Sequence, residues 1–412
     1  MQFKELQLNK PILKAIEAKN YTSATPIQAL TIPLVLAKKD VIASAQTGTG
    51  KTAAFALPIL QLLFDKQDAG KKGKKVKALV ISPTRELAIQ IEDNFETYSK
   101  FTNLRTAVVY GGTSIEPQKD VLKKGVDILV ATPGRLLDLH KQDCLNLDFI
   151  ETLVLDEADL MLDMGFIDDV RKIERLCPTE KQILLFSATM PAKVVQLANT
   201  ILKDPETVDA TPTSSAAKNV NQLLFYVHKQ HKMELCLHLL RNTIKGNILI
   251  FRRTKMGIAK LEKMLKGNGY KVDSIHGDKN QNDREKALNN FKDGVINILI
   301  ATDVAARGID IDNLDAVINF DIPNVSETYV HRIGRTGRAG NTGNAYSFCS
   351  ADEKTYVKDI QKLIQTAIPV MDEHPYVLDP KAKREVHRTP GKSKHKPGRK
   401  SAASKKNKKR WY

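Results

Sequence analysis

The chain has 412 residues, a 42% hydrophobic share and a 27% charged share, which suit a globular protein with two or three domains. It has no run of about 18 apolar residues, so we expect no membrane-spanning helix, and its first residues do not predict a secretory signal. The four cysteines lack metal-binding spacing, so we expect thiols in a reducing cytoplasm. Of the net charge of +17, +12 lies in residues 379–412, which contain 14 Lys or Arg and 2 Asp or Glu.

Short aliphatic runs alternate with segments of helical spacing, as in parallel sheets covered on both faces. The predicted strands are Val41–Ala43, Ala78–Ile81, Ala107–Val109, Asp127–Val130, Thr152–Leu155, Ile183–Phe186, Leu223–Val227, Ile248–Phe251, Val272–Ile275, Ile296–Ile300, Ala316–Asn319 and Ala345–Phe348. Arg85–Ser99 and Lys255–Gly267 predict helices. The fold class is therefore α/β, with one domain over 1–206, a linker over 207–218 and a second domain over 219–368.

A glycine-rich segment lies between the first predicted strand and a helix-like run. It consists of Ala45, Gln46, Thr47, Gly48, Thr49, Gly50, Lys51 and Thr52. Gly48 and Gly50 let backbone N–H groups face phosphates, Lys51 supplies a charge for the β- and γ-phosphates, and the Thr52 hydroxyl suits Mg²⁺. The segment predicts a nucleoside triphosphate site with Mg²⁺.

Acidic residues follow the predicted strand Thr152–Leu155, at the edge where ligands lie in open α/β sheets. Asp156 is suited to hold Mg²⁺, mainly through water, and Glu157 to orient and deprotonate an attacking water. The alternative interpretation is an acidic turn that caps a helix. The phosphate loop upstream favours the catalytic interpretation.

The second half has no phosphate loop but contains a basic segment from His331 to Arg338. Arg335 and Arg338 are three residues apart, which places both on one face of a predicted helical turn. Two guanidinium groups so placed are suited to reach one phosphate during phosphoryl transfer. A basic helix end is the alternative, although it does not explain the interleaved glycines.

The C-terminal segment, residues 369–412, is rich in Lys, Pro, Gly and Ser beyond residue 379. It has too few large apolar residues to offset the entropy of ordering, so we expect it to be largely disordered. Its positive charge favours the binding of polyanions. The segment is interpreted either as a tether for such a polyanion or as a solubilising tail.

The order of these motifs resembles that of the DEAD-box ATP-dependent RNA helicases, over residues 1 to about 365. The matching segments are Tyr21, Thr25–Gln28, Ala45–Thr52, Pro83–Ala88, Gly111–Gly112, Thr132–Arg135, Asp156–Asp159, Ser187–Thr189, Phe251–Thr254, Gln281, Arg284, Ala301–Asp303, Arg307–Asp310 and His331–Arg338. The resemblance implies two RecA-like domains that share one ATP site with Mg²⁺.

The resemblance also implies roles for individual residues. ATP contacts are implied for Phe3, Tyr21, Gln28, Gly308 and Asp310, catalysis for His331 with Arg335 and Arg338, and coupling between the sites for Asp159, Ser187 and Thr189. RNA contacts are implied for Thr84, Arg85, Gly112, Thr132, Gly134, Arg135, Thr254, Gln281, Arg284 and Thr302. Without the resemblance, Phe3 would be a core anchor, Gln28 a surface residue, and Ser187 and Thr189 strand-end caps.

Hydroxyls, glycine backbones and arginines touch phosphates and sugars, so the implied RNA binding is tolerant of sequence. The chain departs from the family at Ala45, at Asn20 and Ala24 beside the adenine-reading segment, and at the basic pair Arg252-Arg253. We expect a cytoplasmic, monomeric enzyme that closes its two domains on ATP and RNA and remodels RNA non-processively, in ribosome assembly or RNA turnover. Two rival functions are an ATP-gated RNA clamp with little unwinding and a DNA translocase.

Overall fold

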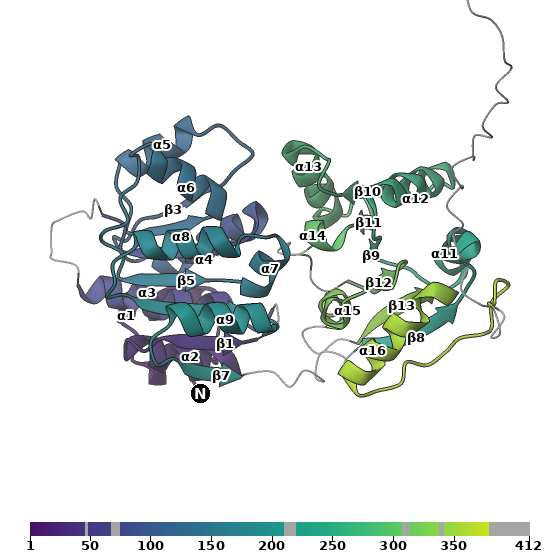
Figure 1. Ribbon diagram of the computed structural model, residues 1–412, viewed down its shortest axis with the longest axis horizontal. Helices are drawn as coiled ribbons and strands as arrows, with labels where there is room; N and C mark the ends of the chain where they lie inside the picture. The colour runs from purple at the N-terminus through teal and green to yellow at the C-terminus, as the bar shows by residue number, and fades with distance from the viewer. Residues whose placement is uncertain are drawn as a thin grey trace, which may run out of the picture.

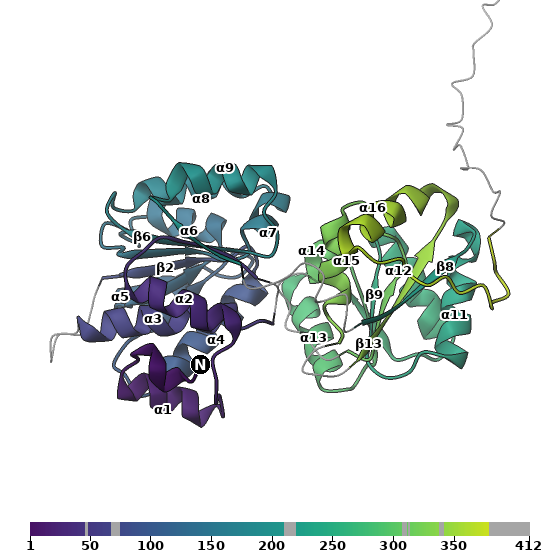
Figure 2. The same cartoon turned by 90° about the horizontal axis from the view of Figure 1, so that it is seen from below.

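The computed structural model describes residues 1–45, 48–66, 75–209, 220–306, 311, 314–337 and 342–378. Gln46, Thr47, Gly308, Asp310 and Arg338 of the predicted site lie outside the described residues, as do most of the predicted linker and residues 379–412. Two α/β lobes lie side by side (Figures 1 and 2). Along the described part of the chain, none of the helices combines the length and the apolar character needed to cross a membrane.

The first lobe contains a seven-stranded parallel sheet in the order β3-β4-β2-β5-β6-β1-β7. Its strands are β1 (Val41–Ser44), β2 (Ala78–Ile81), β3 (Thr106–Val109), β4 (Ile128–Ala131), β5 (Thr152–Leu155), β6 (Gln182–Ser187) and β7 (Glu206–Asp209). Every residue of β2, β4, β5 and β6 is buried. These strands are continuously aliphatic because helices cover both faces of the sheet, so the side chains on either face are shielded from water.

Helices cover both faces of this sheet. One core packs against α1 (Lys10–Ala18), α2 (Pro26–Leu36), α3 (Lys51–Asp65) and α4 (Arg85–Ser99), after the short 3-10 turn η1 (Phe3–Leu6). The other packs against α6 (Pro133–Lys141), α7 (Ala158–Asp163), α8 (Ile167–Leu176) and α9 (Ala192–Ile201), with α5 (Glu116–Lys123) beside β3. Phe55 of α3 anchors the first core against Phe186 of β6, with 5.2 Å between ring centroids.

The second lobe contains a six-stranded parallel sheet in the order β10-β11-β9-β12-β13-β8. Its strands are β8 (Val220–Tyr226), β9 (Ile248–Phe251), β10 (Val272–Ile275), β11 (Ile298–Ala301), β12 (Ala316–Asn319) and β13 (Gly343–Cys349). One face is covered by α11 (Lys232–Asn242) and α12 (Lys255–Gly267), and the other by α13 (Gln281–Lys292), α14 (Asp303–Ala306), α15 (Ser326–Ile333) and α16 (Lys354–Ile364). The turns η2 (Lys229–His231) and η3 (Ala351–Glu353) precede α11 and α16. The predicted α/β class with two parallel sheets is confirmed.

Two segments extend the lobes beyond their predicted bounds. β7 pairs in parallel with β1, so residues assigned to the linker belong to the first sheet. Residues 369–378, assigned to the tail, return to β8, where the Leu224 N–H donates to the Pro369 carbonyl at 2.8 Å and the Leu378 N–H donates to the Tyr226 carbonyl at 3.0 Å. This return covers the outer edge of the sheet.

Candidate functional site

A cavity of about 490 Å³ opens at the C-terminal edge of the first sheet, and the second lobe contributes Arg335 to its wall. The predicted nucleotide residues that line it are Phe3, Tyr21, Gln28, Gly48, Gly50, Lys51, Thr52, Asp156 and Glu157. Gly48 and Gly50 have φ of 82° and 93°, the left-handed region that glycine adopts without strain. Lys51 is the first residue of α3, so the phosphate loop leads directly into the N-terminus of that helix, where the free backbone N–H groups favour anions.

Lys51 and Glu157 form a buried ion pair inside this cavity. The Nζ of Lys51 lies 2.5 Å from Oε1 of Glu157. Burial acts to lower the pKa of Lys51, but the carboxylates of Glu157 and Asp156 outweigh it and raise that pKa above its usual value. Glu157 has φ 57° and ψ 53°, a left-handed conformation that is strained for a residue other than glycine. The strand-to-helix turn after β5 therefore holds the carboxylate of Glu157 at the phosphate loop.

Asp156 has the features of a cation ligand. Its Oδ1 is buried and has no hydrogen-bond partner within the described structure. Burial raises the pKa of Asp156 to about 7, against the opposing charge of Lys51. A buried carboxylate oxygen without a partner is costly unless a ligand satisfies it. Hard oxygen donors on Asp156 and Thr52 are what Mg²⁺ binds, so these residues fit that ion.

The adenine-reading segment contacts the phosphate loop directly. The Thr25 N–H donates to Oε1 of Gln28 at 3.0 Å, and Nε2 of Gln28 donates to the Gly50 carbonyl at 3.2 Å. A Cβ added at Gly50 would lie 2.4 Å from that Nε2, so a side chain there would displace the Gln28 amide and would also be strained by the φ of 93°. Phe3 is buried in η1, whereas the Tyr21 side chain is 44% exposed at the cavity mouth. Gln28 thus joins the base end of the cavity to its phosphate end.

The three predicted coupling residues form one hydrogen-bonded group. Oδ2 of Asp159 accepts from both the N–H and the hydroxyl of Thr189, at 3.0 and 2.9 Å. Oγ of Ser187 accepts from the Asp159 N–H at 3.2 Å and donates to the Thr189 carbonyl at 2.6 Å. The end of β6 is therefore fixed to the turn that carries Glu157. Ala45 joins the group through its N–H, which donates to the Ser187 carbonyl at 3.1 Å.

A second cavity, of about 250 Å³, lies between the lobes and adjoins the first. Glu157, Asp159 and Thr189 line one side, and His331 and Arg335 the other. Arg335 lies just past α15, which ends at Ile333 with Gly334 as its C-cap. Arg335 lies on the hydrogen-bonded turn that follows the helix, where its N–H donates to the Arg332 carbonyl at 3.2 Å. Because Arg338 lies outside the described residues, the face that the two arginines are expected to share stays a prediction. The Arg335 side chain is buried and borders both cavities.

The predicted RNA contacts of the first lobe gather on loops after β2, β3 and β4. The Thr84 hydroxyl caps α4 by accepting from the Leu87 N–H, and Gly112 is exposed with φ 82°. Arg85 lies over the Tyr110 ring, 4.3 Å from its centroid. Nε and Nη1 of Arg85 and Nη1 of Arg135 are buried without hydrogen-bond partners in the described residues. Thr132 is the N-cap of α6, and Gly134 is exposed on its first turn.

Ion pairs and a hydrogen bond connect the predicted RNA-contact regions of the two lobes. Nη2 of Arg85 lies 2.6 Å from Oε1 of Glu285, and Nη2 of Arg284 lies 3.1 Å from Oε1 of Glu86. Nε2 of Gln281 donates to the same Glu86 oxygen at 2.9 Å. Neither Glu86 nor Glu285 was predicted as a site residue. Glu86 lies within the matching segment Pro83–Ala88, and Glu285 directly follows Arg284, a predicted RNA contact.

The remaining residues of the second lobe have local roles. The Thr254 hydroxyl caps α12 by accepting from the Gly257 N–H at 3.1 Å, and the Thr302 hydroxyl accepts from the Ala305 N–H at 3.4 Å. Arg252 and Arg253, the unusual basic pair, are held by carboxylates. Nε of Arg252 donates to Asp321 at 3.1 Å, and Nη2 of Arg253 lies 3.4 Å from Glu353. These contacts give the pair an anchoring role at the start of α12.

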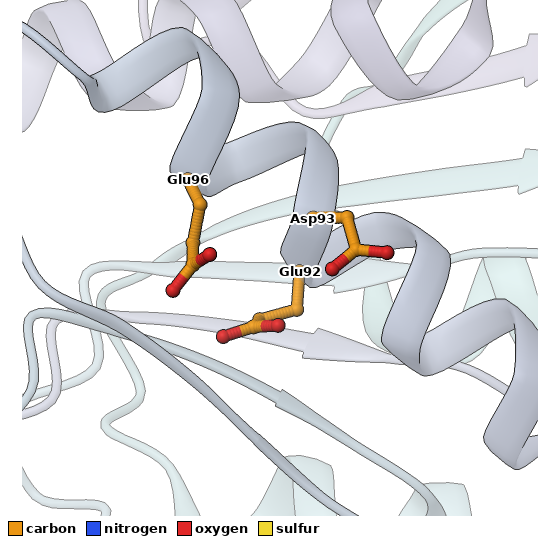
Figure 3. Close-up of side chains that lie close together, drawn as sticks. All are labelled: Glu92, Asp93 and Glu96. Atoms are coloured by element: carbon orange, nitrogen blue, oxygen red, sulfur yellow. The ribbon is translucent and has the colours of Figure 1, made fainter.

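Outside the cavities, α4 carries three close carboxylates, Glu92, Asp93 and Glu96 (Figure 3). Burial raises the pKa of Glu92 to about 7, and the charges of Glu96 and Asp93 add to the effect. Below the usual pKa of 4.5 the Glu92 carboxyl is protonated in both the folded and the unfolded chain. Above about 7 it is ionised in both, and only the folded chain bears the cost of burying this charge and the repulsion from Glu96 and Asp93. This cluster therefore costs stability as the pH rises between those values.

Glu92→Gln is expected to raise the melting temperature of the first lobe at pH 8, because the amide removes the cost of burying a charge and the repulsion from its neighbours. Glu92 is only partly buried, so solvent screening limits the gain to about 1 kcal/mol. Thermal melts at pH 8 and pH 5 measure it, and the gain at pH 5 should be a small fraction of that at pH 8. Equal gains at both pH values would contradict the assignment of the effect to ionisation.

Comparison with known proteins identifies the lobes. Residues 25–198 match the DEAD/DEAH box helicase model, and residues 231–340 match the helicase conserved C-terminal domain. The chain is 43% identical over 376 residues to the DEAD-box ATP-dependent RNA helicase CshA of Geobacillus kaustophilus, which covers 90% of this chain and 79% of that protein. It is 39% identical over 394 residues to the ATP-dependent RNA helicase RhlB of Shewanella piezotolerans, covering 94% of this chain and 90% of that protein.

Solved structures give the same result. S. cerevisiae Dbp5 bound to RNA and ADP BeF3 matches with a TM-score of 0.79 and 32% identity, over 90% of this chain and 95% of that one. The DEAD-box helicase Mss116 bound to ssRNA and UDP-BeF matches with a TM-score of 0.82 and 30% identity, over 90% and 79%. The predicted RecA-like class of both domains is confirmed. The chain therefore belongs to the DEAD-box ATP-dependent RNA helicases and is an RNA-dependent ATPase.

Proposed function

We propose that this protein is a non-processive RNA remodeller in which ATP and RNA together close the two lobes. The observation that carries the proposal is the position of Arg335, a second-lobe residue in the wall of the cavity that holds Lys51, Asp156 and Glu157. A site assembled from both lobes is complete only when they lie together. Closure and catalysis are then one event, and the energy of binding ATP and RNA separates the strands.

Within this site the chain's residues have distinct roles. Lys51 leaves Glu157 for the β- and γ-phosphates, which frees the carboxylate to orient water and accept its proton. Arg335, with Arg338 and His331, stabilises the charge that develops on the transferred phosphoryl group. Mg²⁺, held by Thr52 and by Asp156 mainly through water, would neutralise phosphate charge. Loss of the γ-phosphate removes the group that both lobes contact, so the lobes separate and release RNA.

RNA is proposed to lie across both lobes on the predicted contact residues. Buried guanidinium N–H groups without partners on Arg85, Arg135 and Arg284 support a polyanionic ligand, because each is costly until an acceptor arrives. A phosphate at Arg85 would replace the carboxylate of Glu285, which now occupies one edge of that guanidinium. Contacts of this kind read the backbone rather than the bases, and the ribose 2′-OH distinguishes RNA from DNA.

The test compares ATP hydrolysis with matched RNA and DNA oligonucleotides and follows strand separation of a short RNA duplex. We expect stimulation by RNA alone and ATP-dependent separation of the duplex. Equal stimulation by DNA would support a DNA translocase instead. RNA-stimulated hydrolysis without strand separation would support an ATP-gated clamp.

Residues 379–412 are proposed to tether RNA without sequence preference. Deleting them should weaken RNA binding and flatten its dependence on salt, because fewer counterions are released from the RNA backbone. The ATPase rate without RNA should be unchanged. Binding isotherms over a range of salt concentrations measure this, and an unchanged slope would leave the segment as a solubilising tail.

We propose that the working unit is a monomer with an ATP-binding domain over 1–209 and a second helicase domain over 220–378, joined by a linker and followed by a tail over 379–412. A cytoplasmic place in ribosome assembly or RNA turnover suits an enzyme that reads RNA backbone. Crosslinking in cells, with and without residues 379–412, would identify the bound RNAs.

A further inference from the structure

The side chain of Gln118, on the first turns of α5, is bound at both ends to the loop that follows β3. Its Oε1 accepts from the Tyr110 N–H at 3.0 Å. Its Nε2 donates to the Tyr110 carbonyl at 3.1 Å, to the Thr113 hydroxyl at 3.1 Å and to the Ser114 carbonyl at 3.3 Å. One amide group therefore spans the whole of residues 110–114, which we call the glycine loop.

The glycine loop brings together three predicted RNA contacts from separate segments. It contains Gly112 itself, with an open space where a Cβ would lie. The ring of Tyr110 packs against the Arg85 guanidinium, and the Thr113 carbonyl accepts from Nη2 of Arg135 at 2.7 Å. Displacement of this loop would move the two guanidinium groups as well as the backbone of Gly112.

The loop has little else to order it. Residues 111–114 are exposed and form no helix or strand, and two of them are glycines, which lose the most conformational freedom on ordering. Tyr110 is half-buried, and both of its backbone polar groups are bound by Gln118. Apart from Gln118, two described residues of the lobe hold the loop: Arg135 through its hydrogen bond and Arg85 through its cation–π contact.

We propose that Gln118 is a positioning residue for RNA: it orders the glycine loop and, through Tyr110 and Thr113, aims Arg85 and Arg135 at the RNA backbone. Gln118 touches no reacting atom and carries no charge. The inference rests on the proposed RNA path and adds to it a residue outside every segment that carried the family resemblance. If Gln118 has this role, its removal should lower the affinity for RNA without removing a contact to an RNA phosphate.

The experiment uses the full chain with Gln118→Ala and Gln118→Glu. The RNA concentration for half-maximal ATPase should rise about tenfold in Gln118→Ala, as expected when several bonds that order a binding loop are lost. The rate at saturating RNA and the KM for ATP should be unchanged. Gln118→Glu keeps an acceptor for the Tyr110 N–H but loses every donated bond, so it should also weaken RNA binding.

Two comparisons separate positioning from other effects. Arg135→Ala should lower the slope of RNA affinity against salt by about one phosphate contact, whereas Gln118→Ala should keep the wild-type slope. Gln196→Ala, at an exposed site on α9, is the matched control and should leave RNA binding unchanged. Hydrogen exchange without RNA should rise at residues 110–114 in Gln118→Ala only.

The inference and the proposed function can fail separately. Unchanged half-saturation by RNA in Gln118→Ala, beside a wild-type enzyme that RNA stimulates, would overturn the positioning role. So would a fall in melting temperature with RNA affinity intact, since it would leave Gln118 as a stabilising residue only. A wild-type enzyme that RNA does not stimulate would instead overturn the proposed function, and unchanged exchange at residues 110–114 would still reject the ordering role of Gln118.

Discussion

Glu157→Gln is expected to lower the RNA-stimulated rate of ATP hydrolysis by about 10³-fold, within the range that general-base catalysis supplies. The amide has nearly the shape of the carboxylate and still accepts a hydrogen bond from Lys51, so the cavity should keep its form. It cannot take a proton from water at neutral pH. Glu157 is the residue that suits this role because it borders both cavities, one with the phosphate loop and one with His331 and Arg335.

The same variant should still bind ATP and RNA, and should retain RNA longer because the γ-phosphate is not lost. Equilibrium binding of a fluorescent ATP analogue and dissociation of labelled RNA measure these effects. Glu180→Gln, at a fully exposed surface carboxylate, is the matched control and should hydrolyse ATP normally. Normal turnover in Glu157→Gln would remove Glu157 from its proposed role and leave it as the partner of Lys51 alone.

The predicted strands were confirmed where both faces of the sheet are covered, because continuous aliphatic runs occur there. β7 was missed for the opposite reason. Its residues Glu206, Thr207 and Asp209 are exposed and only Val208 is buried, so it lacks the apolar run of a central strand. Residues 369–378 were missed because they contain no continuous aliphatic run of the length of a strand. They bond to β8 through backbone groups, while the scattered side chains of Met371 and Tyr376 pack against the core and Leu378 is buried.

Parts of the candidate site depend on consecutive residues, and other parts depend on contacts between residues far apart in the sequence. The loop around Gly48 and Gly50 and the strand-end carboxylate of Asp156 depend on a few consecutive residues, so the sequence predicts them. The pairing of Arg85 with Glu285 joins residues 200 positions apart and depends on how the lobes meet. The bonds of Gln118 to Tyr110 involve ordinary helix and loop residues, and their significance emerges only once the loop geometry is known.

The cross-lobe pairs also explain how RNA and closure are coupled. Arg85 and Glu86 of the first lobe face Glu285 and Arg284 of the second in a reciprocal arrangement. These pairs are partly buried, so the cost of desolvating their charges offsets much of their attraction, and they bring the lobes into register without locking them. RNA that takes over Arg85 would replace a weak link between side chains with a ligand held by both lobes.

Arg335→Ala is expected to lower the RNA-stimulated rate of ATP hydrolysis by about 10³-fold or more, the range that an arginine supplied to a phosphoryl-transfer site contributes. Arg335 is buried in the wall of the cavity that Lys51 and Glu157 also line, and a fixed charge held away from solvent stabilises a transition state strongly. ATP binding should change little, because the phosphate loop and Gln28 belong to the first lobe. The loss should therefore appear in the rate at saturating ATP.

Arg335→Lys tests whether shape matters as well as charge. Lysine places a single ammonium where arginine presents a planar fork, so it should recover only part of the lost rate. Arg171→Ala, on the surface of α8, is the matched control and should keep normal activity. Single-turnover hydrolysis with RNA, beside melting temperatures of each variant, measures the effect on chemistry apart from folding. If Arg335→Ala folds, binds RNA and hydrolyses ATP at the wild-type rate, the two-lobe site is wrong, and the first lobe alone carries the chemistry.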